Sequence, residues 1–187
     1  SGKGRDREDK EEYELNAQIA FCVSNKPEHL MLEYYHNSSF LEHGGSPDKA
    51  VRAAFVSAID KYLRDSGKYN KNETKVNFTD IADSLVLVIS SHSTVASYEN
   101  QTKKAITNVF IKDALTEFIK QNLEVYFAEH RQEAEIFANQ VMTNKRARES
   151  AEQTRSDIKK KLQATTDFSN RVEKFVGCRS KDPSVRE

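Results

Sequence analysis

One short stretch of this sequence has the residue types to act on a phosphate group. Gln101-Thr102-Lys103-Lys104 stands at the end of a polar loop that begins at Ser90. A lysine ammonium is a compact charge on a long flexible stem, which suits it to contact a phosphate. An exposed loop lysine is nevertheless usually just solvated, so the tetrapeptide alone makes a weak case for a site.

The rest of the sequence shows no arrangement that predicts catalysis. It has no evident pairing of a nucleophile with a base and no cluster of carboxylates. The histidines lack the spacing of a metal site, and none is expected to be a ligand; they are His29, His36, His43, His92 and His130. Cys22 and Cys178 lie far apart, which favours reduced thiols in a cytoplasmic protein.

A run of basic residues between positions 145 and 161 is the second feature of interest. The candidates for contact with DNA are Lys145, Arg146, Arg148 and Arg155. Acidic residues are interleaved with them, so the plainer interpretation is a solvated mixed-charge helix supported by ion pairs one turn apart. The 29 basic residues balance the 29 acidic ones, so net charge makes no case for nucleic acid. Contact with DNA here would be non-specific and salt-dependent.

Patterns of apolar residues predict the elements that must hold these groups. Residues 15–23 and 30–34 alternate as half-buried strands joined by a turn, which predicts an antiparallel hairpin. Residues 85–89 form an unbroken apolar run rich in β-branched residues, typical of a central buried strand. An amphipathic helix is predicted over 47–66, with Ser46 as its N-cap.

Two further helices are predicted towards the end of the chain. Asn108 can cap a helix that runs to about His130, and a second runs from Gln132 to about Gln163. Apolar residues become scarce after Met142, so the later part of the second helix is expected to project into solvent. The order strand, strand, helix, strand, helix, long helix indicates an α+β domain, with helices on one face of a small mixed sheet.

The chain is expected to divide into four parts. Residues 1–12 are almost all charged residues and glycine, and they are predicted to be disordered. Residues 13–130 form the α+β domain, 131–165 the long helix and 166–187 an irregular connector. The mean hydropathy of −0.76 predicts a modest core. No apolar run approaches the length of a membrane span, so no membrane association is expected.

Three short segments occur in a fixed order along the chain, at His43–Ser46, Tyr98–Lys103 and Gly177–Ser184. In this order they resemble the B subunits of bacterial type IIA DNA topoisomerases, gyrase and topoisomerase IV. His43-Gly44-Gly45-Ser46 is similar to the Glu-Gly-Gly-Thr step of that family, and Tyr98-Glu99-Asn100-Gln101-Thr102-Lys103 to its Phe-Glu-Gly-Gln-Thr-Lys loop. Gly177-Cys178-Arg179-Ser180-Lys181-Asp182-Pro183-Ser184 resembles the Cys-Ser-Ser-Lys-Asp-Pro stretch that leads into the TOPRIM domain. Asn100 and Thr107 each stand where the family has glycine.

The resemblance implies the transducer, the second domain of a GHKL-type ATPase, followed by a long helix towards the DNA-cleavage core. It implies that Lys103 is a catalytic lysine that contacts the γ-phosphate of ATP, and that Gln101 positions the γ-phosphate or the attacking water. The glycines at 44 and 45 need only permit a tight turn.

The resemblance also implies cofactors and partners. ATP and Mg²⁺ would act in the full-length DNA topoisomerase, whereas the fragment alone would bind neither and would be inactive. The partners would be a preceding ATPase domain, a following TOPRIM domain, an A-type subunit with the cleavage tyrosine, double-stranded DNA and a second copy in a homodimer.

Two alternatives remain open from the sequence. One is a non-enzymatic interaction module whose charged helix pairs with a partner helix, although only Val141 and Met142 supply apolar contacts near its middle. The other is the second domain of a mismatch-repair-type GHKL ATPase, and the stretch from Cys178 to Ser184 speaks against it.

Overall fold

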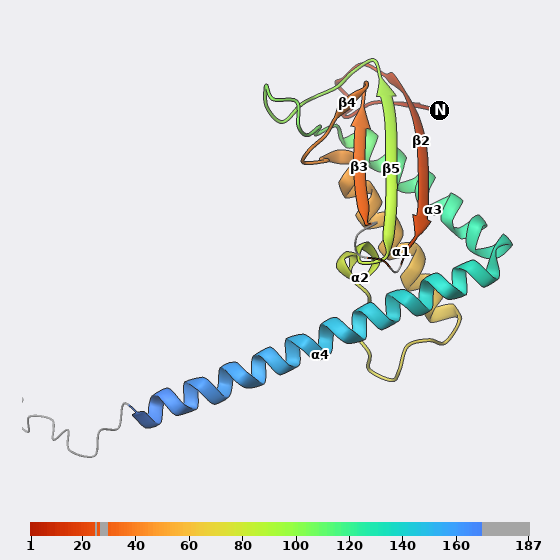
Figure 1. Ribbon diagram of the computed structural model, residues 1–187. Coiled ribbons are helices and arrows are strands. Elements are labelled where there is room, and N and C mark those ends of the chain that lie inside the picture. The colour runs from red at the N-terminus through yellow and green to blue at the C-terminus, as the bar shows by residue number, and fades with distance from the viewer. Residues whose placement is uncertain (25, 27–29, 170–187) are drawn as a thin grey trace, which may run out of the picture. The chain divides into compact units, whose positions relative to one another are not determined.

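The computed structural model describes residues 1–24, 26 and 30–169, and its strands form one five-stranded mixed sheet in the order β1-β2-β5-β3-β4 (Figure 1). The strands are β1 (Gly2–Gly4), β2 (Tyr13–Val23), β3 (Met31–His36), β4 (Ser39–Phe40) and β5 (Leu85–Ser93). Strand β5 is antiparallel to β2 and parallel to β3.

The apolar run at 85–89 is confirmed as the central strand. Leu85, Leu87 and Ile89 are fully buried on one face of β5, while Val86 and Val88 are half-buried on the other. The predicted hairpin of the first two strands is wrong, because β5 lies between β2 and β3. A strand that is apolar on both faces gains most from a neighbour at each edge, and the parallel pair of β3 and β5 is joined by a crossover through helices.

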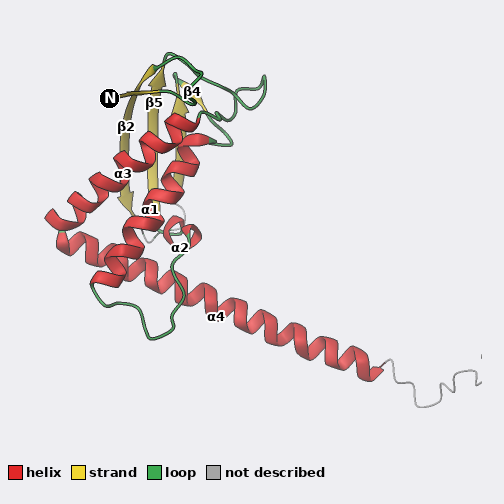
Figure 2. Cartoon of the chain, turned by 180° about the vertical axis from the view of Figure 1, so that it is seen from behind, coloured by secondary structure: helices red, strands yellow, loops and turns green. Residues whose placement is uncertain are grey.

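The helices are α1 (Ser46–Asp65), α2 (Phe78–Ala82), α3 (Val109–Glu129) and α4 (Arg131–Ser169). Helices α1 and α3 pack along each other across the same face of the sheet, as Figure 2 shows. Their buried apolar residues include Phe55, Ile59, Leu63, Ile111, Leu115 and Ile119. The α+β class, with a mixed sheet and a long C-terminal helix, is therefore confirmed.

Contacts divide the chain into two compact units, Ser1–Arg146 and Ala147–Glu187. Within the first unit, Phe137 and Val141 of α4 belong to the hydrophobic core. This core therefore extends past residue 130, where the sequence suggested the domain would end. In the second unit, none of the described residues 147–163 is buried. No helix of the described residues is long and apolar enough to cross a membrane.

The prediction that residues 1–12 are disordered is wrong in this structure. Gly2 and Gly4 of β1 pair with Leu15 and Tyr13 of β2. Composition suggested disorder because the segment has almost nothing to bury. It is instead held by backbone pairing and by polar side chains that find partners elsewhere in the fold.

His36 is a fully buried histidine at the end of β3. Its Nδ1 lies 2.9 Å from the Ser91 hydroxyl oxygen, and its Nε2 lies 3.1 Å from that of Ser93. Burial, followed by the charge of His92, lowers the pKa of His36 from 6.5 to about 4. The neutral ring is therefore the form that the fold accommodates.

Acidification should weaken the fold through His36. Between pH 7 and pH 5 the unfolded chain takes up a proton on this residue and the folded chain does not, so the free energy of unfolding should fall by about 2 kcal/mol. Urea denaturation of the chain and of His36→Gln at both pH values measures this. The variant should lose less stability over the interval, and an equal loss in both proteins would contradict the assignment.

Candidate functional site

The loop 94–108 joins β5 to α3 and carries the residues that the sequence singled out. Its two arms are held side by side. The Glu99 N–H donates to Ala105 O at 3.0 Å, and the Thr107 N–H donates to Ser97 O at 2.8 Å. The loop therefore has the form of a narrow two-armed projection with residues 100–104 at its tip.

A side-chain turn closes the tip of the loop. Asn100 Oδ1 accepts a hydrogen bond from the Thr102 N–H at 3.1 Å, and the Lys103 N–H donates to Asn100 O at 3.2 Å. Lys103 takes the positive φ of 55°, whereas neither Asn100 nor Thr107 has a positive φ. The two departures from the family's glycines are thus compatible with this backbone, because an asparagine side chain can close a turn itself.

Gln101 and Lys103 are exposed at the tip. The Lys103 ammonium lies 5.5 Å from the centre of the Tyr98 ring, within reach of a cation–π contact. Neighbouring Lys104 pairs with Glu42. Among the described residues no ion pair involves Lys103, so its ammonium presents a positive charge that no carboxylate neutralises.

The base of the loop rests on the turn before α1. The Ser46 N–H donates to Ile106 O at 2.8 Å, and the His43 N–H donates to Lys104 O at 2.9 Å. A Cβ on Gly45 would lie 2.2 Å from Ile106 O, and Gly45 has a φ of 76°. Glycine is therefore required both by the backbone conformation and by this close approach.

The predicted N-cap role of Ser46 is wrong. Gly45 occupies the N-cap position of α1, and its carbonyl accepts from the Lys49 N–H at 3.0 Å. The Ser46 hydroxyl instead donates to Asn108 O at 2.7 Å. The Ser46 side chain therefore bonds to the end of the loop 94–108 instead of capping α1.

Asn108 occupies the N-cap position of α3 but does not cap the helix with its side chain. Its Oδ1 accepts from the Ser97 N–H at 2.7 Å, and its Nδ2 donates to Asp6 Oδ2 at 2.8 Å and to the Tyr13 hydroxyl at 3.2 Å. The helix is capped by Asp6 Oδ1, which accepts from the Phe110 N–H at 2.9 Å. A residue from the segment predicted to be disordered thus caps a helix far along the chain.

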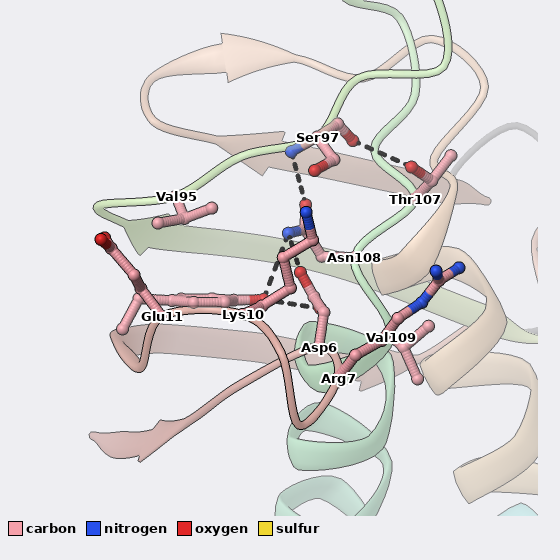
Figure 3. A pocket seen from close by; sticks show the side chains of 10 residues that line it. Asp6, Arg7, Lys10, Glu11, Val95, Ser97, Thr107, Asn108 and Val109 are labelled. Atoms are coloured by element: carbon pink, nitrogen blue, oxygen red, sulfur yellow. Dashed lines mark hydrogen bonds between the residues drawn. The ribbon is translucent and has the colours of Figure 1, made fainter.

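The surroundings of Asp6 keep its carboxyl charged. Burial raises the pKa of Asp6, but hydrogen bonds from the Phe110 N–H and from the Tyr13 and Asn108 side chains outweigh that effect and lower it overall. A pocket of about 520 Å³ opens beside this cluster and is lined by Arg7, Lys10 and Glu11, among others (Figure 3).

The prediction that Lys145 contacts DNA is wrong in this structure, because the residue is fully buried. Its ammonium lies 3.0 Å from Glu73 Oε1, and the Arg146 Nε lies 3.3 Å from the same oxygen. The hydrogen bond from Arg146 comes first among the causes that lower the pKa of Glu73 to about 2. No sequence pattern signalled this pair, since its members are far apart along the chain.

The two remaining basic candidates lie in the second unit. Arg148 pairs with Glu152 one helical turn away at 3.2 Å, and Arg155 is exposed. The pair matches the solvated mixed-charge helix. Contact of Arg146, Arg148 or Arg155 with DNA stays a prediction.

Two expectations concern other parts of the molecule. The stretch from Gly177 to Ser184, which resembles the approach to a TOPRIM domain, lies outside the described residues. Within the described residues, no three histidine, cysteine, aspartate or glutamate side chains are grouped to hold a metal ion.

Two solved structures that share this fold are nucleotide-binding domains of topoisomerases. The 43K ATPase domain of Thermus thermophilus gyrase B, in complex with an aminocoumarin, aligns with a TM-score of 0.67 at 18% identity, over 76% of this chain and 38% of that one. The topoisomerase IV ATP-binding domain of Francisella tularensis gives 0.61 at 20% identity, over 73% and 36% of the two chains.

Proteins related in sequence identify the family to which the chain belongs. The DNA gyrase B protein of Metamycoplasma arthritidis is 29% identical over 82% of this chain, and that of Mycobacterium tuberculosis is 25% identical over all of it. The alignments cover 24% and 26% of those two relatives, so the chain spans about a quarter of their length. The sequence model of the family described as DNA gyrase B matches residues 3–157. The chain belongs to the DNA gyrase B family.

Proposed function

We propose that this chain is the transducer of a type IIA topoisomerase B-type polypeptide, and that Lys103 contacts the γ-phosphate of an ATP molecule held by a preceding ATPase domain. The observation that carries the proposal is the loop tip. It exposes Lys103 and Gln101 together on a two-armed support, and no carboxylate of the described residues pairs with the lysine.

The chemistry follows from the residue types. The Lys103 ammonium stabilises negative charge that develops on the transferring phosphoryl group, and the Gln101 amide orients the γ-phosphate or the attacking water. ATP and Mg²⁺ belong to the preceding domain, and they supply the reacting phosphate and the metal that neutralises it. Once phosphate leaves, the lysine loses its contact.

The loop is also placed to transmit movement. Its base is bonded to the start of α1 at Ser46 and leads directly into α3 at Asn108. A displacement of the tip is therefore passed to the two helices that cover the sheet. We propose that this domain moves as a rigid body against the ATPase domain and so couples ATP hydrolysis to DNA strand passage.

The proposal assigns the remaining partners. They are a following TOPRIM domain, an A-type subunit that carries the cleavage tyrosine, double-stranded DNA, and a second copy of the B-type polypeptide in a homodimer. The complete enzyme would act in the cytoplasm, and this segment alone would neither hydrolyse ATP nor cleave DNA.

The test is Lys103→Ala in the complete B-type polypeptide, assembled with its A-type partner. ATP turnover at saturating ATP should fall about 100-fold, because one donor to the transition-state charge is lost. ATP-dependent strand passage should fall with it, and the urea midpoint should not change. Lys104→Ala, which removes the adjacent lysine that pairs with Glu42, is the matched control and should keep near-normal turnover. Normal turnover in Lys103→Ala would remove this residue from the mechanism.

A further inference from the structure

We infer that Asp6 is a positioning residue for Lys103, acting through Asn108 to hold the base of the loop 94–108 in one place. The inference rests on the proposed function for its effect on ATP turnover. The arrangement itself stands on the contacts of a carboxylate that comes from the first residues of the chain.

Asp6 serves two structures with one carboxylate. Its Oδ1 accepts from the Phe110 N–H at 2.9 Å and from the Tyr13 hydroxyl at 2.8 Å. Its Oδ2 accepts from Asn108 Nδ2 at 2.8 Å (Figure 3). The first contact caps α3, and the last fixes the asparagine amide that ends the loop. Hydrogen bonds to an ionised acceptor are stronger than neutral ones, so the charge of Asp6 matters to both.

Asn108 carries this constraint into the loop. Asn108 is almost completely buried, at 2% exposure, and its Oδ1 accepts from the N–H of Ser97 in the outgoing arm at 2.7 Å. Its backbone carbonyl accepts from the Ser46 hydroxyl at the start of α1. One asparagine thus joins the outgoing arm, the returning arm, the start of α1 and the first residues of the chain.

The position of the tip depends on this junction. The arms above it are joined by the bonds between Ser97 and Thr107 and between Glu99 and Ala105, so their common base decides where the tip points. If the hydrogen bond between Asp6 and Asn108 is lost, the base of the loop is less firmly held and the Lys103 ammonium samples a wider range of positions. Transition-state contacts are sensitive to displacements of about 1 Å, so turnover should suffer before binding does.

The experiment compares Asp6→Ala with Asp9→Ala in the complete B-type polypeptide. Asp9 is an exposed carboxylate of the same segment. Asp6→Ala should lower kcat about 10-fold while KM for ATP changes little, the pattern of a contact made mainly in the transition state. Asp6→Asn keeps one acceptor oxygen without the charge and should fall between, and Asp9→Ala should behave as the unchanged protein.

Amide hydrogen exchange separates positioning from general destabilisation. Exchange at the Ser97 and Thr107 amides should rise about 10-fold in Asp6→Ala, while the buried Ile89 amide of β5 keeps its protection. Tyr13→Phe removes the hydroxyl that donates to Asp6 and accepts from Asn108. It should likewise raise exchange at the Ser97 and Thr107 amides and leave the Ile89 amide protected. A rise at Ile89 equal to that at Ser97 would overturn the inference.

A double variant distinguishes this inference from the function on which it rests. If Asp6 acts through Lys103, Asp6→Ala adds nothing to the defect of Lys103→Ala. An additional 10-fold loss in the double variant would show that Asp6 acts by another route. Normal turnover in Lys103→Ala would defeat the proposed function alone, and the exchange measurement would still decide whether Asp6 holds the loop. Normal kcat in Asp6→Ala beside a slow Lys103→Ala would overturn only the role of Asp6.

Discussion

The Gly45→Ala variant is expected to lose about 4 kcal/mol of unfolding free energy, because a positive φ and a backbone clash act together. The added Cβ would stand 2.2 Å from Ile106 O and 2.7 Å from Ile106 N. Neither atom belongs to a flexible side chain that could move aside. The loop 94–108 would have to shift as a whole, and with it the tip that carries Lys103.

Gly67→Ala separates the two causes of that loss. Gly67 also has a positive φ, of 64°, but nothing lies within 4 Å of the position that a Cβ would take, so its alanine carries only the conformational strain of about 1 kcal/mol. Urea denaturation of both variants measures the difference, and tryptic cleavage after Lys103 reports whether the loop has loosened. Equal losses in the two variants would mean that the contact of Gly45 with Ile106 carries no weight.

Glu73→Ala is expected to cost about 3 kcal/mol, because it takes a carboxylate away from the buried Lys145 ammonium. The side chain of Lys145 has no exposed surface, so water cannot replace the lost partner without opening the fold. The pKa of Glu73, lowered from 4.5 to about 2, indicates when the pair breaks in acid. Its contribution is complete above pH 4.5 and is lost as the pH falls towards 2.

Two variants calibrate this cost in the same urea denaturation experiment. Arg148→Ala removes a side chain from a more exposed helical ion pair and should cost less than about 1 kcal/mol. Lys145→Met combined with Glu73→Ala replaces the buried charge by an apolar chain of similar length and should regain most of the loss. The assignment of Lys145 as a structural ion-pair partner fails if Glu73→Ala is no more costly than Arg148→Ala.

The contacts of Gly45 and the pair of Lys145 and Glu73 hold two different parts of the domain in place. Gly45 lets the loop approach the start of α1 closely enough for backbone pairing. Lys145 and Glu73 fasten the first part of α4 to the segment between α1 and α2 within the first unit. In the proposed mechanism, a movement of the loop tip would therefore act on a domain whose parts are held together by these contacts.

Local patterns were enough to predict the elements that support the loop. The helical spacing of Phe55, Ile59 and Leu63 predicted α1, and the apolar run at 85–89 predicted the central strand. The order of the short motifs predicted the family, which the match to DNA gyrase B confirms. The signals for α1 and for the central strand each lie within a few neighbouring residues, where periodicity acts directly.

The sequence by itself determined the type of the main elements, the family, and which lysine stands at the end of the polar loop. Only the tertiary structure decided that β5 separates β2 from β3, that Asp6 caps α3 and holds Asn108, and that Lys145 is buried against Glu73. Charge patterns show which residues need partners, but not which distant segment supplies them. That choice depends on how the sheet and helices bring residues about 70 to 100 positions apart into contact, which no local spacing encodes.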